Sequence, residues 1–374
     1  MTATHAASQG DPQLRSALAH WAPRLIANGI PLTDFQDVTG GMTAWSDWCR
    51  AWVARGEVHE ALGEHDLAQG HRLSAGEHFS RAAVCHHFAK FVFVEDIDQM
   101  RSAHAKAVAA RLKALPLIDP PGERVEIPFQ GNTLKGELRK PSARRSDASG
   151  KAGSARPPIV VMCMGLDSCK EEMDAYERNF LERGIATLAF DGPGQGEGES
   201  EFAIQGDYEV PVRAVFDWLQ TRTDIDPERA ALWGVSLGGY YAPRAAAFEK
   251  RARACIALSG PYNMGANWDG LPELTRRAFQ VRAKCATDDA ARHHAHTLSL
   301  EGVAGDITCP LFIVAGKQDR LIPWQDAERL AREASGPVEL LLVEDGNHVV
   351  NNRAYRYRTQ TADWMAAQLG LPKS

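Results

Sequence analysis

The sequence of 374 residues lacks any hydrophobic stretch long enough to cross a membrane. Its longest clean apolar run, from Ile159 to Met164, suits a buried strand, whereas a helix that spans a bilayer needs about 20 apolar residues. The first residues, Met1 to Arg15, also lack the basic stretch followed by an apolar segment that marks a secretory signal. We therefore expect neither a membrane-spanning segment nor a secretory signal.

The sequence also has no excess of basic residues and no paired cysteine motif. Its 42 Lys and Arg against 48 Asp and Glu give a formal net charge of −6, which argues against a nucleic-acid-binding surface. The cysteines are odd in number, scattered and never spaced as CxxC, which favours reduced thiols in a cytoplasmic protein. They are Cys49, Cys85, Cys163, Cys169, Cys255, Cys285 and Cys309.

The first third of the chain has helical periodicity. Trp45, Trp48 and Trp52 recur at helical spacing, and Ser74 with Glu77 fits a capping box at the start of a second helix. A third helix is predicted over 96–113, after which several prolines end helical structure. The length suits two domains, and we predict an all-helical domain over residues 1–120.

The rest of the chain, residues 121–374, changes to the pattern of a sheet. A hairpin is predicted over 125–138, with a turn signal at Gly131 and Asn132, and a flexible surface loop over 142–158. Short apolar strands then alternate with helices, which indicates a mostly parallel sheet with helices on both faces. The strands are predicted at 159–164, 186–190, 230–235, 254–258, 311–315 and 338–343, with a helical insertion near 262–306.

One motif in this part carries nucleophile chemistry. Gly234-Val-Ser236-Leu-Gly238 is GxSxG, and it lies between an apolar strand and a helix, where a sharp turn exposes the Ser hydroxyl above the sheet. A structural Ser at a turn is the alternative. An aliphatic hydroxyl needs an adjacent base, and the acid and the His follow the Ser in chain order in the α/β-hydrolase fold.

Both partners are present after later strands. Asp319 follows the strand at 311–315 and is the predicted orienting acid, although a turn-forming Asp is an alternative interpretation. His348 follows the last strand and is the predicted general base; Asp345, on the same loop, is the second candidate for the acid. The predicted oxyanion hole consists of the Leu237 and Leu166 amides.

No cofactor or metal is expected. The Gly-rich segment 191–197 fits neither GxGxxG nor a phosphate-binding loop with its Lys, and we interpret it as a tight turn near the active site. His293, His294 and His296 lack the partner spacing of a metal site, so surface or pocket-lining roles are preferred to ion binding.

Five segments together resemble a known family. They are 73–79, 87–91, 165–172, 191–197 and 233–241. They are similar to the α/β-hydrolases that include 2,6-dihydroxypseudooxynicotine hydrolase, which cleave carbon–carbon bonds, and more distantly to fermentation–respiration switch proteins and fungal polyketide chain-shortening hydrolases. The resemblance implies that residues 1–120 form a cap over an α/β-hydrolase domain, that the protein is a homodimer, and that Ser236, Asp319 and His348 are the triad.

The resemblance also implies the reaction class. We expect hydrolysis of a carbon–carbon bond next to a ketone in a small aromatic or β-dicarbonyl substrate, with a pocket acid that assists the leaving group. Candidate pocket residues are Asp269, Glu273, His86, His87 and Tyr240; His86 and His87 lie on an apolar helix, where core packing is the default. The alternatives are a carboxylesterase, which needs no extra acid, and a non-catalytic binding protein that retains the fold.

Overall fold

The computed structural model describes residues 11–142 and 156–372, and the chain divides into two compact units. The first, called the helical unit, comprises Met1–Pro121 and Glu171–Ala175; the second, called the sheet unit, comprises Gly122–Lys170 and Tyr176–Ser374. The boundary after Pro121 lies one residue from the predicted one, but the short segment Glu171–Ala175 was expected in the other domain. Most of the loop predicted over 142–158 lies outside the described residues.

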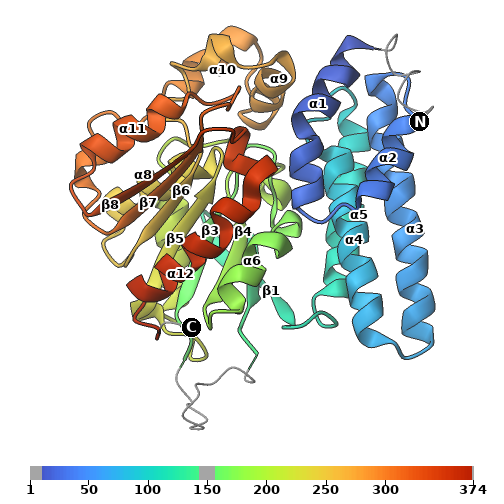
Figure 1. Ribbon diagram of the computed structural model, residues 1–374, viewed down its shortest axis with the longest axis horizontal. Helices are drawn as coiled ribbons and strands as arrows, with labels where there is room; N and C mark the ends of the chain where they lie inside the picture. Colours follow the sequence, from blue (N-terminus) through green and yellow to red (C-terminus); the bar gives the residue numbers. More distant parts are fainter. Residues whose placement is uncertain (1–10, 143–155, 373–374) are drawn as a thin grey trace. The chain divides into compact units, whose positions relative to one another are not determined.

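Among the described residues, the α-helices that lie entirely within the helical unit are α1 to α5 (Figure 1). They are α1 (Pro12–Ala27), α2 (Leu32–Gly40), α3 (Trp48–Ala68), α4 (Arg72–Lys90) and α5 (Ile97–Ala114). Two glycines of α3 admit aromatic rings of α4, because a Cβ on Gly56 would lie 2.4 Å from the His86 ring and a Cβ on Gly63 would lie 2.7 Å from the Phe79 ring. Two glycines on the same face of α3 therefore let α3 and α4 pack closely.

The helix starts match the sequence signals in one case and not in another. Asp96 caps α5, as its side chain accepts hydrogen bonds from the Asp98 and Gln99 amides. The capping box predicted at Ser74 is wrong, because α4 already begins at Arg72. Gly70, with a φ of 80°, turns the chain directly after α3, so the next helix begins two residues before Ser74.

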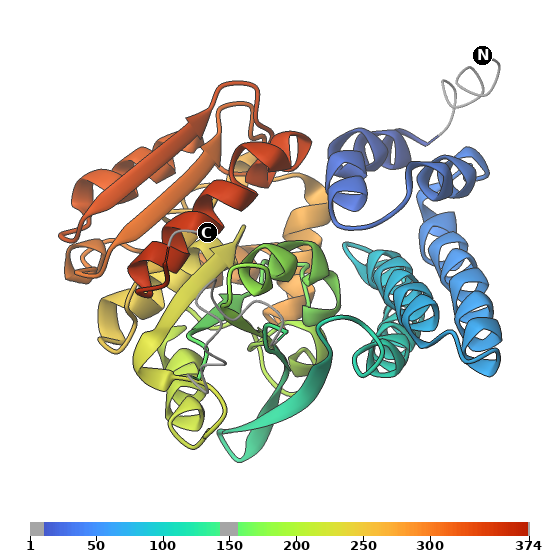
Figure 2. The ribbon, with the colours of Figure 1, turned by 60° about the horizontal axis from the view of Figure 1, so that its bottom comes forward.

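The sheet unit is built on an eight-stranded sheet in the order β1-β2-β4-β3-β5-β6-β7-β8. The hairpin β1–β2 is antiparallel, β2 pairs antiparallel with β4, and all other pairs are parallel. Figure 2 shows the hairpin at one edge and β7 and β8 at the other. The strands are β1 (Gly122–Phe129), β2 (Asn132–Arg139), β3 (Ile159–Cys163), β4 (Ala186–Asp191), β5 (Ala230–Val235), β6 (Cys255–Leu258), β7 (Leu311–Gly316) and β8 (Val338–Val343). The hairpin turn is at Gln130 and Gly131, both with positive φ, one residue before the predicted signal.

Helices cover both faces of this sheet. They are α6 (Asp174–Leu181), α7 (Glu209–Leu219), α8 (Gly238–Phe248), α9 (Glu273–Arg282), α10 (Asp288–Ala295), α11 (Trp324–Glu333) and α12 (Arg358–Gln368). Trp233 of β5 contacts Tyr176 at a ring distance of 4.9 Å, and α12 packs through an aromatic contact on the same face, where Figure 1 shows it beside α6. Neighbouring residues of a strand point to opposite faces, and Gly234 faces Ala242 of α8. The mostly parallel sheet with helices on both faces is as predicted, and α9 and α10 lie between β6 and β7.

Within the described residues, no helix combines the length and the apolar character that a bilayer span requires.

Candidate active site

Ser236 lies in the tight turn between β5 and α8. Its φ of 57° is in the left-handed region that side-chain-bearing residues rarely adopt. The flanking glycines make this turn possible, because a Cβ on Gly234 would lie 1.8 Å from the Gly238 oxygen and a Cβ on Gly238 would lie 2.0 Å from the Cys163 oxygen. The strand, strained Ser and helix that GxSxG requires are therefore all present.

The structure brings three predicted residues into one hydrogen-bonded chain. His348 Nε2 lies 2.8 Å from Ser236 Oγ, and His348 Nδ1 lies 2.7 Å from Asp319 Oδ2. The His348 and Asp319 side chains are almost fully buried, and the second carboxylate oxygen of Asp319 accepts the Leu321 and Ile322 amides at 2.8 and 3.1 Å. This arrangement fixes the orientation of the imidazole toward the Ser hydroxyl.

The second candidate for the acid lies elsewhere. Asp345 pairs with Arg353 at 2.8 Å, and its side chain is 46% exposed. The loop that carries His348 has a strained backbone, because Val349 and Val350 have φ values of 58° and 54°. The Val349 amide donates a hydrogen bond to Ser259 Oγ at 3.1 Å. β-Branched residues in this region carry strain, which concentrates at functional sites. No local sequence pattern predicts this backbone strain.

The predicted oxyanion donors lie at the ends of neighbouring strands. Leu237 directly follows Ser236, and Leu166 follows β3, which pairs with β5. A Cβ on Gly165 would lie 3.1 Å from the Ser236 Cβ, so the loop after β3 runs alongside the Ser. Within the part of the chain that the structure describes, neither the Leu237 nor the Leu166 amide donates a hydrogen bond to another group. Both N–H groups therefore have no hydrogen-bond acceptor within the described residues.

The predicted pocket residues of the sheet unit do not join this chain. Asp269 is exposed and pairs with Arg292, and Glu273 is exposed in the first turn of α9. The Tyr240 hydroxyl donates to the Gly206 oxygen at 2.6 Å, and burial raises the pKa of this hydroxyl. Among the described residues, no hydrogen bond or ion pair joins Asp269, Glu273 or Tyr240 to the Ser, His and Asp of the site.

His86 and His87 are buried side chains of the helical unit. Burial lowers the pKa of His86 to about 4, so its ring is neutral near pH 7. His87 Nε2 lies 3.1 Å from Glu172 Oε2, and Arg24 donates to both oxygens of this carboxylate at 2.8 and 2.7 Å. Burial raises the pKa of Glu172, but the charges and hydrogen bonds of Arg24 and His87 together outweigh it, so the net pKa is lowered. These contacts fit core packing for both histidines.

The Gly-rich loop after β4 is more closely connected to the site than its sequence suggests. Asp191 Oδ2 lies 2.7 Å from Lys170 Nζ, and Lys170 also pairs with Glu197 at 2.8 Å. Burial raises the pKa of Glu197, but Lys170 and Arg124 outweigh it and lower the pKa overall. Gln195 of this loop donates to backbone oxygens of the loop after β3. Sequence reasoning missed these contacts, since glycines mark the turn but no motif marks its partner.

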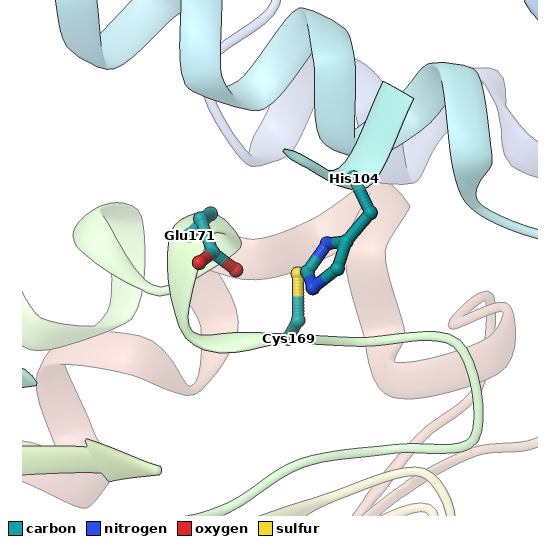
Figure 3. A group of neighbouring side chains, drawn as sticks. All are labelled: His104, Cys169 and Glu171. Carbon is teal, nitrogen blue, oxygen red and sulfur yellow. The ribbon is translucent and has the colours of Figure 1, made fainter. Parts of the chain in front are cut away.

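The histidines considered for ion binding do not gather. His294 Nε2 lies 2.9 Å from the Ile204 oxygen, and within residues 11–142 and 156–372 no group of three close ligand side chains includes any of the three. In the helical unit, ligand atoms of His104 and Glu171 lie within 4.8 Å of each other (Figure 3). The sheet-unit residue Cys169 is also labelled there.

Comparison with known proteins places this site in a family. Residues 172–371, more than half of the chain, match the sequence model of the prolyl oligopeptidase family. The chain is 33% identical over 352 residues to 2,6-dihydropseudooxynicotine hydrolase of Paenarthrobacter nicotinovorans, covering 93% of this chain and 91% of that protein. It is also 33% identical over 233 residues to the hydrolase acrC of Aspergillus aculeatus, covering 58% of this chain and 54% of that protein.

A solved structure agrees over the whole fold. The crystal structure of 2,6-dihydroxy-pseudo-oxynicotine hydrolase superposes with a TM-score of 0.84 at 33% identity, covering 93% of this chain and 95% of that chain. The chain is therefore a hydrolase that belongs to the prolyl oligopeptidase family of α/β-hydrolases, in the group of 2,6-dihydropseudooxynicotine hydrolase.

Proposed function

We propose that this protein hydrolyses a carbon–carbon bond next to a ketone, in an aromatic or β-dicarbonyl compound, by Ser-His-Asp chemistry. The observation that carries the catalytic part is the chain from Ser236 Oγ through both nitrogens of His348 to Asp319, with hydrogen bonds of 2.8 and 2.7 Å. A Ser, a base within hydrogen-bonding reach and a third group that orients the base are the parts of an activated nucleophile. The bond and substrate class rest on the resemblance to hydrolases of this group.

In this mechanism His348 Nε2 takes the Ser236 proton, and the alkoxide attacks the ketone carbon. The oxygen that becomes negative lies between the Leu237 and Leu166 N–H groups. As the carbon–carbon bond breaks, its electron pair leaves with the departing fragment, which takes the proton from the His348 imidazolium. An ester remains on Ser236, and water activated by His348 hydrolyses it to a carboxylic acid. Because neither Asp269 nor Glu273 contacts the triad, we assign the proton transfer to His348 alone.

Carboxylic ester hydrolysis is the second candidate. The specific observation in its favour is that the hydrogen-bonded chain is complete without a further acid among the described residues. An alkoxide or phenoxide leaves more readily than carbon, so the same triad suffices for an ester. Incubation with matched aryl ketones and aryl esters, followed by mass analysis of products, separates the two; turnover of esters alone would remove carbon–carbon cleavage as the main activity.

Ser236→Ala tests the nucleophile itself. We expect loss of turnover and loss of covalent labelling by a fluorophosphonate probe, since both need the hydroxyl. Thr361→Ala is the matched control, because Thr361 lies on α12 and its buried hydroxyl donates to the oxygen of Tyr357, the residue before that helix, outside the proposed triad. Labelling of Ser236→Ala as fast as the wild type would overturn the assignment.

We also propose that the protein acts in the cytoplasm as a homodimer. All seven cysteines are free thiols, which fits a reducing compartment, and the dimer rests on the resemblance alone. Light scattering after size-exclusion chromatography tests the dimer, and a mass near 40.9 kDa would contradict it.

A further inference from the structure

Turn formation alone does not explain the side chain of Gln195. It is only 1% exposed and faces the loop that follows β3. Its Nε2 donates to the Met164 oxygen at 2.6 Å and to the Gly165 oxygen at 2.8 Å. A Gln amide has two N–H donors, so both are used on consecutive carbonyls of one loop. Gln195 therefore fixes that loop at two points.

The second of these carbonyls shares a peptide group with the Leu166 amide. A trans peptide is planar and holds its C=O and N–H on opposite sides. A donor that fixes the Gly165 oxygen therefore fixes the direction of the Leu166 N–H. This peptide lies beside the nucleophile, because a Cβ on Gly165 would lie 3.1 Å from the Ser236 Cβ. A hydrogen bond at the carbonyl also polarises the peptide and strengthens its N–H as a donor.

We propose that Gln195 is a positioning residue of the oxyanion hole. It holds the Gly165–Leu166 peptide so that the Leu166 N–H points to the oxygen that becomes negative when Ser236 attacks. This inference rests on the proposed function, and it assigns a role in that reaction to a loop whose glycines alone suggest a turn. Gln195 does not touch the reacting atoms; it acts through the backbone of a neighbouring strand's loop.

The position of Gln195 is itself fixed by its other end. Its Oε1 accepts the Gly192 amide at 3.2 Å and the Tyr208 hydroxyl at 2.9 Å. Because both groups are donors, the side-chain oxygen of Gln195 must face them, and the NH2 group therefore faces the loop after β3. Tyr208 stacks on Tyr241 with ring centres 3.7 Å apart, and both rings are buried. The amide is thus held in one orientation by a rigid neighbour.

If Gln195 had only a structural role, the expected result would be different. Its loss would lower the stability of the sheet unit and leave the rate per folded molecule unchanged. A positioning residue instead changes the rate of the step that develops negative charge, since only interactions stronger in the transition state raise the rate. Turnover per active site and affinity for a tetrahedral analogue therefore separate the two roles.

The first variant is Gln195→Met, which keeps the side-chain length and removes both donors. With p-nitrophenyl acetate we expect kcat per labelled site to fall by about 10- to 100-fold, less than the roughly 10²- to 10³-fold loss when an oxyanion donor is deleted. The inhibition constant of an aryl trifluoromethyl ketone, which forms a tetrahedral adduct, should rise by a similar factor. Fluorophosphonate labelling should still reach the wild-type stoichiometry. Gln220→Met, at the exposed end of α7, is the matched control and should match the wild type.

Two further variants keep the test decisive if Gln195→Met does not fold. Tyr208→Phe retains the stacked ring and both donors of Gln195 but removes one restraint, so we expect a smaller loss of kcat with the inhibitor affinity changing in parallel. Gln195→Glu retains the shape, but a charged carboxylate cannot donate to the two carbonyls and a protonated one can donate to one of them. Its kcat relative to the wild type should therefore rise as the pH falls.

The outcomes are distinguishable. Failure of the wild type to react with the fluorophosphonate would overturn the proposed function and this inference with it. A labelled wild type together with Gln195→Met at wild-type kcat and inhibitor affinity would overturn the inference alone. If Gln195→Met is unfolded, a Gln195→Glu ratio independent of pH and an unaltered Tyr208→Phe enzyme would overturn it as well. A rate loss with parallel weakening of the inhibitor and full labelling supports it.

Discussion

Asp319→Asn probes how the acid of the proposed triad sets the protonation of the imidazole. Asp319 divides its oxygens: Oδ1 accepts two backbone amides, at 2.8 and 3.1 Å, and Oδ2 faces His348 Nδ1 at 2.7 Å. In the variant the amide oxygen should keep the position facing the two backbone donors, because an NH2 group there would meet them donor to donor. The NH2 group then donates to His348 Nδ1, and the neutral imidazole carries its proton on Nε2.

That tautomer removes the acceptor that the nucleophile needs. Ser236 Oγ lies 2.8 Å from His348 Nε2, and a protonated Nε2 cannot take its hydrogen. The same tautomer change in a serine protease triad lowers kcat about 10⁴-fold, which corresponds to about 5.5 kcal/mol at about 1.36 kcal/mol per factor of ten. We expect a loss of this order in kcat for p-nitrophenyl acetate, with a parallel slowing of fluorophosphonate labelling.

Asp345→Asn is the matched control, since it makes the same chemical change at the other acid near His348. Asp345 pairs with Arg353 and its side chain is 46% exposed, and exposed ion pairs contribute about 0–1 kcal/mol. Its kcat should stay close to that of the wild type. The reasoning is refuted if Asp319→Asn retains more than about a tenth of wild-type kcat, or if the control loses as much activity as the test variant.

Two further predictions concern folding. Gly238→Ala places a Cβ 2.0 Å from the Cys163 oxygen, so we expect no soluble, folded enzyme, whereas Gly270→Ala, with no atom within 4 Å, should express and melt like the wild type. Glu172→Gln breaks the buried ion pair with Arg24 and should lower the free energy of unfolding in urea by about 3–5 kcal/mol; an unchanged midpoint at pH 7 would contradict it. The folded-state pKa of Glu172 is lowered, because Arg24 is the main contribution acting against the effect of burial. The stability that the ion pair contributes is therefore present above the unfolded-state pKa of about 4.3 and is lost as the pH falls through the folded-state pKa. The difference in stability between variant and wild type should thus shrink only in acid.

Local patterns predicted the features that depend on neighbours in the sequence. A buried parallel strand is a short apolar run between turn residues, and β5 and β8 begin and end where those runs do. The GxSxG turn is equally local, since its two glycines relieve contacts of a single strand–turn–helix unit. The order of nucleophile, acid and base along the chain follows from the fold, and it led to Asp319 and His348, which the structure brings to Ser236.

Features that depend on distant pairs could not be predicted. The segment Glu171–Ala175 belongs to the helical unit, and Glu172 pairs there with Arg24, 148 positions away. No periodicity records such a pairing. The start of α4 was misplaced for a related reason, because a good capping pattern at Ser74 competed with a turn at Gly70 that fixed the helix start earlier. Local helix propensity is a weak guide to the first residue of a helix when the connection to the preceding helix is as short as the one between α3 and α4.

The order of the strands explains why the role proposed for Gln195 has no sequence motif. β3 lies between β4 and β5, although β4 comes between them in the chain. The chain runs from β3 to β4 on one side and from β5 to β6 on the other, so the connections after these two neighbouring strands leave in opposite directions. In open α/β sheets, ligands bind at the carboxyl ends of the strands beside such a point. Ser236 follows β5, Leu166 follows β3 and Gln195 follows β4, so three neighbouring strands each contribute one part. A sequence motif describes one strand and the loop that follows it. The side chain proposed to hold the Gly165–Leu166 peptide comes instead from the loop after the adjacent strand β4, and only the order of the strands in the sheet brings the two loops together.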